Sequence, residues 1–447
     1  MNELKMDAEE FSQLKHAFMG GHTHANANYV RKVLRNVASQ DFTSSYPAVM
    51  VLEKFPMSRA KTLDHELTKE EFIRLILTKA CMFDLELTDV YHKLKNEHPI
   101  SRSKCWICEN PIEDNGRIVM ADRLVITVTE QDFITYSHFY KWGDYKVSNF
   151  RYYDKQYLPH EFVKAILKLY KDKTTLKGVE EEAVNYMISK NMLNASFGMT
   201  VTNPVREEIE YDNEKSVYVP HKPILQEAIE SYNKSIRRFL FYPWGVWITA
   251  YARRNLFTAI EELGDDFVYS DTDSVKYLNP EKHEEYFNAY NLKVMAKISL
   301  AAKYHRIPES EFSPLNKKGE AKTIGLWDYE GCYEKFKTLG AKRYLVQENG
   351  NIKATIAGAN KIKAAAYLVM TGDPFGNFDD DLKIPPEFAG RLTLSYIDDE
   401  HEGVVTDYLG NKFHYHELSA IHMEPSEYNL SLSNDFIKYL KGMKELE

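Results

Sequence analysis

The sequence predicts an α+β protein in which short strands are interspersed with longer helices. Strand-like runs of apolar and aromatic residues flank a tight acidic turn within Val268–Tyr277. Helical spacing and capping signals mark residues 159–198 and 246–263. The chain has 447 residues, of which 44% are hydrophobic and 13% aromatic. That composition is typical of a globular chain with enough apolar surface for about two to four lobes with cores.

Composition also excludes several classes of protein. The longest apolar run, residues 239–252, contains Pro243 and is too short to cross a bilayer. The first ten residues, MNELKMDAEE, are polar and acidic rather than a secretory signal. Four cysteines suit a reducing compartment, so we expect a cytoplasmic protein with no membrane partner.

Charge gives a mixed indication about nucleic acid. The net charge of −9 counts against a nucleic-acid binder, which is usually basic. The distribution of charge matters more than its sum, and the basic residues gather in two runs. These runs are Lys164, Lys168, Lys171, Lys173 and Lys177, and then Lys335, Lys337, Lys342 and Arg343.

Cys105 and Cys108 form a single CxxC pair. No second Cys or His pair follows at zinc-finger spacing, so His92, His98 or His138 would have to complete a zinc site. We favour ordinary loop or core cysteines over a metal site at this pair.

The strongest local signal is Asp271-Thr272-Asp273 between two strand-like runs. Two carboxylates on a tight turn, aimed by the strands that flank it, offer the hard oxygen ligands that divalent cations prefer. A solvated Asp-rich turn is the alternative that this stretch alone leaves open.

Two further stretches carry groups suited to phosphate chemistry. Asp41–Pro47 has the sequence DFTSSYP. We expect a strand-like segment to begin at Asp41, which places the acid at one end of that strand. A helix should run from after Gly178 to Phe197 and stop at Gly198. Its spacing places four side chains on one face, namely Tyr186, Lys190, Asn194 and Phe197.

In chain order these stretches resemble the three polymerase motifs of family B DNA polymerases. Those motifs read Asp-x-x-Ser-x-Tyr-Pro, Lys-x-x-x-Asn-Ser-x-Tyr-Gly and Tyr-x-Asp-Thr-Asp-Ser. Phe18-Met19-Gly20-Gly21 is similar to the Tyr-x-Gly-Gly stretch of the protein-primed phage and plasmid branch. The chain departs from these patterns at Phe18 and Phe197, where the family has Tyr, and at Ala195, where it has Ser. The resemblance spans roughly residues 18–361.

The resemblance implies a right-hand polymerase with palm, fingers and thumb lobes. Only about forty residues precede the first motif, too few for a 3′–5′ exonuclease domain, so we expect a polymerase module without one. The expected divisions are a first palm part at 1–83, an insertion in or beside the palm at 84–157, fingers helices at 158–198, a second palm part at 199–338, and a thumb and C-terminal region at 339–447.

The reaction implied is template-directed transfer of deoxynucleotides to a primer 3′-OH by a two-metal mechanism. Asp41, Asp273 and the backbone carbonyl of Phe42 would hold two Mg²⁺ ions, for which Mn²⁺ would substitute. Asp271 is the third carboxylate, and Lys190 completes the expected catalytic set by countering charge on the leaving pyrophosphate.

The resemblance also assigns binding residues. The expected nucleotide-binding residues are Phe42, Ser44, Ser45, Tyr46, Lys173, Lys190, Asn194 and Phe197. The expected DNA-binding residues are Gly20, Gly21, Thr249, Arg253, Lys342 and Tyr344. Tyr46 would lie under the incoming sugar and exclude a 2′-OH, whereas without the motif it would be interpreted as a core aromatic residue before a proline.

The implied partners are primer–template DNA and deoxynucleoside triphosphates. A separate exonuclease subunit or a terminal priming protein stays open as a further partner, and a phage-encoded enzyme would work in the host cytoplasm. A two-metal nuclease and a catalytically inactive, DNA-binding polymerase-like module are the alternatives. A reverse transcriptase is disfavoured because its motif pairs two adjacent acids, whereas Thr272 separates them here.

Several elements outside the motifs are also predicted. Thr68-Lys69-Glu70-Glu71 is a capping box for a helix that should reach about Met82. Asn349-Gly350 signals a hairpin after a strand that begins at Lys342, where Lys342 and Tyr344 would share one face. Further predicted elements are a strand at 123–128, helices at 131–142 and 360–370, and a hairpin within 199–238.

Overall fold

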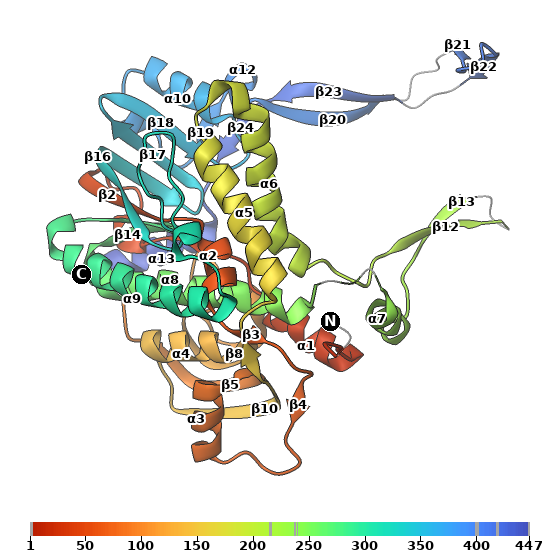
Figure 1. Ribbon diagram of the computed structural model, residues 1–447. Coiled ribbons are helices and arrows are strands. Elements are labelled where there is room, and N and C mark those ends of the chain that lie inside the picture. The colour runs from red at the N-terminus through yellow and green to blue at the C-terminus, as the bar shows by residue number, and fades with distance from the viewer. Residues whose placement is uncertain are drawn as a thin grey trace. The chain divides into compact units, whose positions relative to one another are not determined.

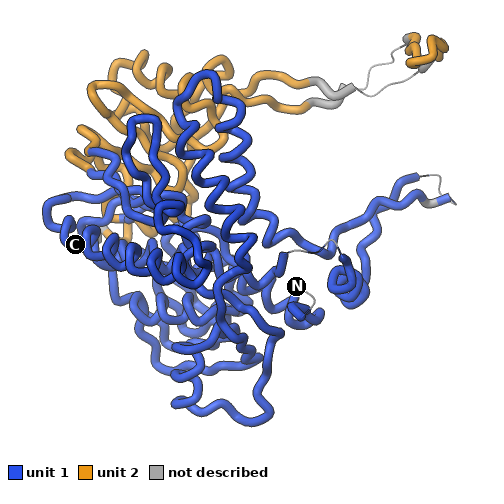
Figure 2. Tube along the Cα trace, viewed as in Figure 1, with its two compact units in different colours: residues 1–27, 38–331 blue, residues 28–37, 332–447 orange. Residues whose placement is uncertain are grey.

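The computed structural model describes residues 3–213, 217–236, 238, 240–397, 402–416 and 420–445. The chain divides into two compact units (Figure 2). Unit 1 comprises Met1–Ala27 and Ala38–Gly331, and unit 2 comprises Asn28–Val37 and Cys332–Glu447. Among the helices described, none is both long enough and apolar enough to span a bilayer.

An antiparallel sheet in unit 1 carries the acidic turn. In unit 1 its strands follow the order β1-β14-β15-β2-β16, with bounds β1 Thr23–Ala25, β14 Phe267–Asp271, β15 Ser274–Tyr277, β2 Leu34–Phe42 and β16 Trp327–Gly340. Val268, Tyr269 and Val275 are fully buried, which explains why this run of apolar residues forms central strands. The predicted hairpin with its acids at the turn is confirmed.

The helices of unit 1 are labelled in Figure 1. They are α1 Ala8–Ala17, α2 Ser45–Leu52, α3 Lys69–Thr78, α4 Glu130–Phe139, α5 His160–Leu176, α6 Ala183–Thr200, α7 Leu225–Lys234, α8 Tyr242–Leu263 and α9 Glu284–His305. Helix α8 is buried along most of its length and includes the fully buried Trp244 and Trp247. Gly264 ends it with a positive φ of 50°, as its C-terminal position predicts.

The segment between α2 and α5 forms a second sheet in unit 1. Its main strand order is β4-β10-β5-β8-β6, with β7 paired to β8 and β9 to β5. The strands are β4 Lys61–Thr62, β5 Ala80–His92, β6 Cys105–Glu109, β7 Ile112–Asp114, β8 Arg117–Thr129, β9 Tyr140–Lys141 and β10 Asp144–Tyr153. Phe72, Phe83, Phe133 and Phe150 pack edge-to-face or stacked in its core.

Helices α5 and α6 lie side by side and antiparallel, as predicted for residues 158–198 (Figure 1). Lys164 and Lys168 are exposed on α5, whereas Ile166 and Leu167 are buried, because the apolar stripe of the helix packs against the hydrophobic core of unit 1. The hairpin predicted within 199–238 is present as β12 Glu208–Asp212 and β13 Val217–His221.

Unit 2 contains antiparallel strands and short helices. Strand β16 Trp327–Gly340 enters it at Cys332 and pairs with β17 Arg343–Glu348, which pairs with β18 Asn351–Ile356. The Asn349-Gly350 hairpin is confirmed, and so is the helix after Asn360, whose side chain caps α10 Lys361–Met370. The remaining elements are α11 Pro374–Asn377, β19 Leu382–Ile384, α12 Pro386–Ala389, β20 Arg391–Ile397, β21 Glu402–Thr406, β22 Lys412–His416, β23 Ala420–Ser426, β24 Tyr428–Leu430 and α13 Asn434–Glu445.

The strand predicted to begin at Asp41 is wrong. Asp41 lies at the end of β2, and the residues that follow form helix α2 instead. Pro47 in the first turn is compatible with a helix because its missing N–H needs no partner there. The buried run from Ala48 to Leu52 is short and continuously apolar, a pattern that fits a strand and a buried helix equally well.

Other boundaries differ from the prediction too: α4 ends at Phe139 rather than at residue 142, and α8 begins at Tyr242 rather than at residue 246. Helix α3 begins as expected, with Thr68 Oγ1 accepting from Glu71 N at 3.3 Å, but it ends at Thr78 because β5 starts at Ala80. Helix α6 continues through Gly198 to Thr200. Lys342 lies before β17 with a φ of 57°, so it does not share a strand face with Tyr344.

Candidate active site

Asp41 lies near the end of β2, and Asp273 lies in the turn just before β15, the strand that pairs with β2. Asp41 is the cross-strand partner of Ser274, the residue after Asp273. The backbone N–H of Phe42 donates to the carbonyl of Asp273 at 2.7 Å. Two acids that are far apart in the sequence are therefore brought together at one end of a rigid sheet.

The acidic turn is held from the other side by β1. Thr272 has a left-handed φ of 59°, and its N–H donates to the carbonyl of His22 at 2.6 Å. Thr23 Oγ1 donates to Asp271 Oδ1 at 3.0 Å. The carboxylate of Asp271 is thus tied to β1.

The carboxylates are short of compensating charge. Burial, reinforced by the negative charges of Asp273 and Glu330, raises the pKa of Asp41 to about 7, although Lys276 and Lys173 oppose the shift. Lys276 is buried and donates to Ser39 Oγ at 2.7 Å, with its Nζ 3.8 Å from Glu330. An acid whose ionised form is this costly is suited to binding a cation.

Lysines and carboxylates line one cavity of about 480 Å³. Lys173 Nζ donates to Ser44 Oγ at 2.8 Å, and burial together with the charges of Lys177 and Lys190 lowers the pKa of Lys173. The charged lining residues are Asp41, Lys173, Lys177, Lys317, Lys318, Lys322, Asp328 and Glu330. Such a cavity presents both the acids that a cation needs and the bases that a polyphosphate needs.

An aromatic wall adjoins the acids. The rings of Tyr46 and Phe197 stack with centroids 4.4 Å apart and an interplanar angle of 27°. A Cβ added to Gly21 would lie 2.8 Å from the Tyr46 hydroxyl and 2.7 Å from Thr272 Cγ2. Gly21 is therefore required by close packing. It brings the Gly-Gly stretch into contact with Tyr46 of the first motif and Thr272 of the acidic turn.

Other predicted nucleotide-binding residues are placed as follows. Ser44 has a φ of 57° and is the N-cap of α2, while Ser45 is buried in its first turn. Phe42 packs its ring on Trp327 at 3.9 Å, so only its backbone faces the acids. Lys190 is half-buried with Nζ 6.0 Å from the Tyr186 ring, and Asn194 is exposed on α6.

Two predicted DNA-binding side chains point into the protein. Thr249 is buried, and its hydroxyl donates to the Val246 carbonyl at 3.0 Å. Arg253 is 7% exposed and forms a fork on Asp132, with nitrogen–oxygen distances of 2.8 and 3.0 Å. Arg253 also donates to the carbonyls of Met19 and of Gly20, the latter at 3.0 Å, and so holds the Gly-Gly stretch in place.

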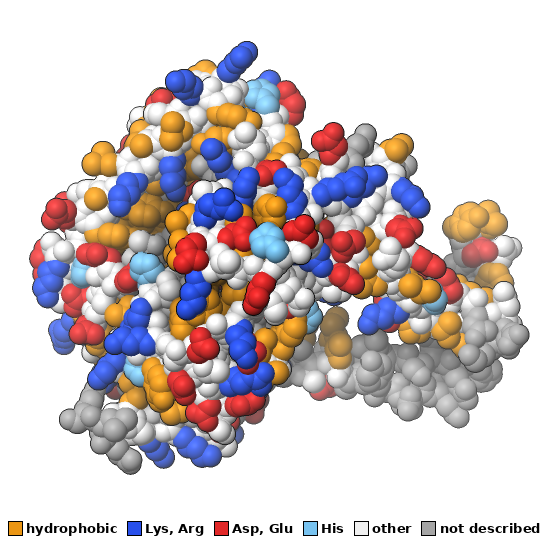
Figure 3. Space-filling view, turned by 90° about the horizontal axis from the view of Figure 1, so that it is seen from below, with side chains coloured by type: hydrophobic (Ala, Val, Ile, Leu, Met, Phe, Trp, Pro, Cys, Tyr) orange, Lys and Arg blue, Asp and Glu red, His pale blue; other side chains and the backbone are white. Residues whose placement is uncertain are grey.

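The last two predicted DNA-binding residues belong to unit 2. Lys342 lies in the turn before β17, and the ring of Tyr344 stacks on Phe336 at 5.6 Å. Charge on the surface of the molecule is mixed: Figure 3 shows basic and acidic side chains interspersed over the face it presents.

Sequence reasoning missed several of these residues. Glu330 and Lys276 reach the acids only through strand pairing, and no motif marks them. Lys317 comes from a turn closed by the Leu315–Ala321 bridge, and its Nζ donates to the Gly178 carbonyl at 2.5 Å. The pair of adjacent lysines at 317 and 318 was the available sequence signal.

The CxxC pair lies in β6, with Cys105 buried and Cys108 half-buried. All four cysteines are free thiols. Within the described residues, the pair does not belong to any group of three metal-ligating side chains within reach of one ion.

Comparison with known proteins identifies the family. The family model for DNA polymerase type B, organellar and viral, matches residues 2–289, well over half of the chain. The chain belongs to this family. The membership in family B that the three motifs indicated is therefore confirmed.

Curated members of the family from bacteriophages are similar to the chain. The DNA polymerase of Bacillus phage Nf is 23% identical over 343 residues, which cover 76% of this chain and 50% of the phage protein. The DNA polymerase of Bacillus phage B103 is 22% identical over 344 residues, with the same two coverages. The chain thus spans about half the length of these relatives.

Solved family structures share the fold. Phi29 DNA polymerase complexed with primer–template DNA and incoming nucleotide has a TM-score of 0.55 and 15% identity, covering 93% of this chain and 63% of that one. Its binary complex with primer–template DNA also has a TM-score of 0.55, with 16% identity, and covers 83% and 58%. The mixed helix and sheet architecture is common to both proteins.

Proposed function

We propose that the chain is a template-directed DNA polymerase that transfers deoxynucleotides to a primer 3′-OH. The observation that carries the proposal is the convergence of Asp41, in β2, and Asp273, in the turn before the paired strand β15, beside a cavity lined by Lys173. Family membership and the phage relatives named DNA polymerase support the same activity. The Phi29 complexes make primer–template DNA and deoxynucleoside triphosphates the proposed partners.

The acids fit a pair of divalent ions. Burial and mutual repulsion raise the pKa of Asp41 to about 7, and a cation would relieve that repulsion. Asp41, Asp273 and the carbonyl of Phe42 are the proposed ligands for two Mg²⁺ ions, with Mn²⁺ as a substitute. When bound, the ions supply Lewis-acid activation of the 3′-OH and neutralise phosphate charge. Asp271 holds the turn through Thr23, and that bond keeps Asp273 in register with Asp41.

The lysines of the cavity are proposed to bind the triphosphate. Lys173 is held by Ser44 and reaches the same space as Asp41, so it can pair with phosphate oxygens close to the acids. The N-terminus of α2, which begins with Ser45, adds the positive end of a helix dipole. Lys190 adds positive charge from α6, while Asn194 is assigned to the nucleotide pocket through its motif.

Tyr46 and Phe197 are proposed to form the floor of the sugar and base pocket. Their stacked rings make a flat apolar surface next to Gly21. An immobilised tyrosine ring under the sugar leaves no room for a 2′-OH, which would give selectivity for deoxynucleotides.

The lobes follow from this assignment as a proposal. The β1-β14-β15-β2 sheet with its helices would form the palm, within 1–83 and 199–338, and the α5–α6 pair would form the fingers. The second sheet would be the insertion at 84–157, and residues 339–447 would form the thumb and C-terminal region.

Asp273→Asn provides the direct test. It should abolish primer extension while primer–template binding stays within about twofold, because the amide keeps the size of the side chain and removes only its charge. Extension by Asp273→Asn at wild-type rate would refute the site. Release of mononucleotides instead of pyrophosphate by the wild-type protein would identify a nuclease.

A second variant tests the pocket. Tyr46→Val should raise ribonucleotide incorporation, and Tyr46→Phe should not, because only the first removes the ring. Equal sugar selectivity in both variants would exclude the gate role of Tyr46.

A further inference from the structure

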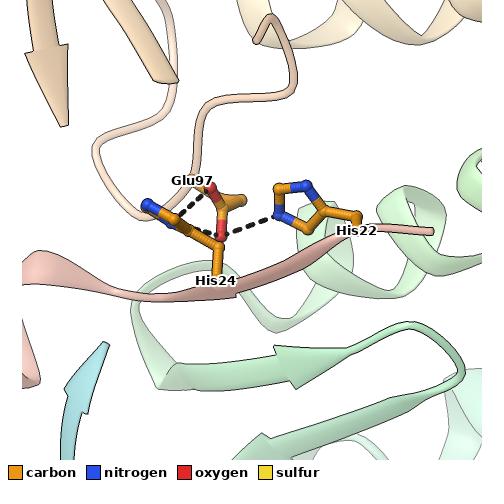
Figure 4. A group of neighbouring side chains, drawn as sticks. All are labelled: His22, His24 and Glu97. Carbon is orange, nitrogen blue, oxygen red and sulfur yellow. Dashed lines mark hydrogen bonds and ion pairs between the residues drawn. The ribbon is translucent and has the colours of Figure 1, made fainter. Parts of the chain in front are cut away.

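A buried group of two imidazoles and a carboxylate lies beneath β1 (Figure 4). It consists of His22, His24 and Glu97, whose exposed fractions are 1%, 2% and 0%. One nitrogen or oxygen from each lies within 4.8 Å of the others. The closest approaches are 3.3 Å from His22 Nε2 to Glu97 Oε2 and 2.9 Å from His24 Nδ1 to Glu97 Oε1.

We propose that His22, His24 and Glu97 bind one divalent transition-metal ion, with Zn²⁺ as the preferred ion. Two imidazole nitrogens and one carboxylate oxygen are a recurrent ligand set for zinc. In a tetrahedral site with bonds of about 2.0–2.1 Å, ligand atoms lie roughly 3.3–3.4 Å apart. Both imidazoles approach the same oxygen, Glu97 Oε2: the 3.3 Å from His22 Nε2 already fits, and the 3.1 Å from His24 Nδ1 needs to lengthen by only a few tenths of an ångström.

The surroundings have the arrangement expected around metal ligands. His24 directs Nδ1 to the centre and Nε2 to the backbone carbonyl of Asp114 at 3.2 Å. Glu97 Oε1 accepts from the backbone N–H of His98 at 2.7 Å. Such outer contacts fix the tautomer and orientation of ligating side chains. In the described part of the chain, His22 Nδ1 has no hydrogen-bond partner, although it is fully buried.

At neutral pH two of the three groups are in the state that a metal needs, whereas His24 must lose a proton. Burial lowers the pKa of His22 to about 4, so its imidazole is neutral. His24 and His22 overcome burial and hold the pKa of Glu97 well below its usual range, so it is a carboxylate. Glu97 and Asp114 likewise overcome burial and raise the pKa of His24, which would release a proton when the metal binds.

Nearby charges act in both directions. Arg117 is buried close enough to lower the pKa of His22, and it would oppose a cation. Burial raises the pKa of Asp114 to about 7, and its carboxylate lies 3.8 Å from His24 Nε2, on the side of the ring away from the proposed ion. The alternative to a metal site is an ion pair between protonated His24 and Glu97, and the experiment below distinguishes the two.

The site would fasten a loop of the second sheet region to β1. Glu97 lies in the loop after β5, whereas His22 and His24 belong to the β1 segment. The carbonyl of His22 accepts from Thr272 N at 2.6 Å, and Thr23 donates to Asp271. A metal here would therefore stiffen the strand that holds the acidic turn.

The first experiment measures metal in the full-length protein. The protein is purified without chelator or affinity metal, washed with Mg²⁺, and assayed by elemental analysis. One equivalent of zinc per chain is expected. Co²⁺ added to the metal-free protein should give the visible absorption of a tetrahedral site. Absence of bound zinc together with absence of the cobalt spectrum would overturn the proposal.

Variants locate the ion. Glu97→Gln and His22→Gln should each lose the bound equivalent, while Cys105→Ser and Cys108→Ser should retain it, which separates this site from the cysteine pair. Zinc should raise the melting temperature of the metal-free wild-type protein by several degrees and leave that of Glu97→Gln unchanged. Retention of zinc by Glu97→Gln, or its loss on replacing the cysteines, would refute the assignment to His22, His24 and Glu97.

Discussion

The crowding of carboxylates at the acidic turn predicts that one catalytic substitution stabilises the metal-free protein. Asp41→Asn removes a charge that burial, Asp273 and Glu330 all disfavour. In chelator the variant should therefore be more stable than wild type, even though it should be inactive in primer extension.

The size of the effect follows from the pKa shift of Asp41. Its pKa rises from 3.8 to about 7, or roughly 3 units, which corresponds to about 4 kcal/mol at 1.36 kcal/mol per unit. Because the carboxylate faces an open cavity, solvent screening reduces the expected gain to about 2 kcal/mol.

The sign depends on pH. An acid with a raised folded-state pKa binds more protons when folded, so it destabilises the fold increasingly from pH 3.8 up to about 7, and fully above that value. The advantage of Asp41→Asn should be absent near pH 4 and complete at pH 8.

The assay is denaturant unfolding of wild type and variant in EDTA at pH 8, repeated in excess Mg²⁺. The ion should stabilise wild type and remove most of the difference. Asp64→Asn is the matched control, because Asp64 is fully exposed and its loss should leave stability essentially unchanged. An Asp41→Asn variant that is no more stable than wild type in EDTA would refute the electrostatic reasoning.

Three further predictions concern a lysine, an arginine and a glutamate of unit 1. Lys173→Ala should lower kcat/KM for nucleotide by about tenfold or more. Lys171→Ala is the control, because it loses only an exposed 3.4 Å ion pair with Glu311, and equal losses in both variants would remove Lys173 from the triphosphate site. Arg253→Lys should lower the free energy of unfolding by about 3 kcal/mol, because it breaks the paired hydrogen bonds from the guanidinium to the buried Asp132 carboxylate. Weaker DNA binding at unchanged stability would instead indicate that Arg253 contacts DNA. Burial raises the pKa of Glu10 from 4.5 to about 7, so the ionised side chain destabilises the fold. Glu10→Gln should therefore stabilise the protein by up to roughly 3 kcal/mol at pH 8 and not at pH 4.5, which denaturant unfolding curves at both pH values would measure.

Local chemistry could be predicted from the sequence wherever one short stretch contains the whole signal. The acidic hairpin, the Asn349-Gly350 turn and the cap at Thr68 are of this kind. Their residue types specify a backbone conformation within a few positions, so tertiary context has little to override.

The sequence was less informative where the partner comes from another element. The apolar run after Pro47 is compatible with a strand or a helix, and only its packing among α5, α8 and α9 decides for the helix. Glu330 gains its place beside Asp41 by strand pairing. Arg253 has the same appearance in the sequence whether it faces DNA or Asp132, and burial distinguishes these two environments only in the fold.

The register of β2 against β15 has a consequence for synthesis of the chain. Residues 38–41 of β2 pair with Ser274–Tyr277, and β1 pairs with β14, the strand just before β15. A nascent chain must therefore expose both early strands until residue 277 has left the ribosome, while the intervening second sheet can already pair locally. We expect ribosome-stalled fragments that end before β14 to be protease-sensitive at β1 and β2 and to require chaperones until the acidic hairpin emerges.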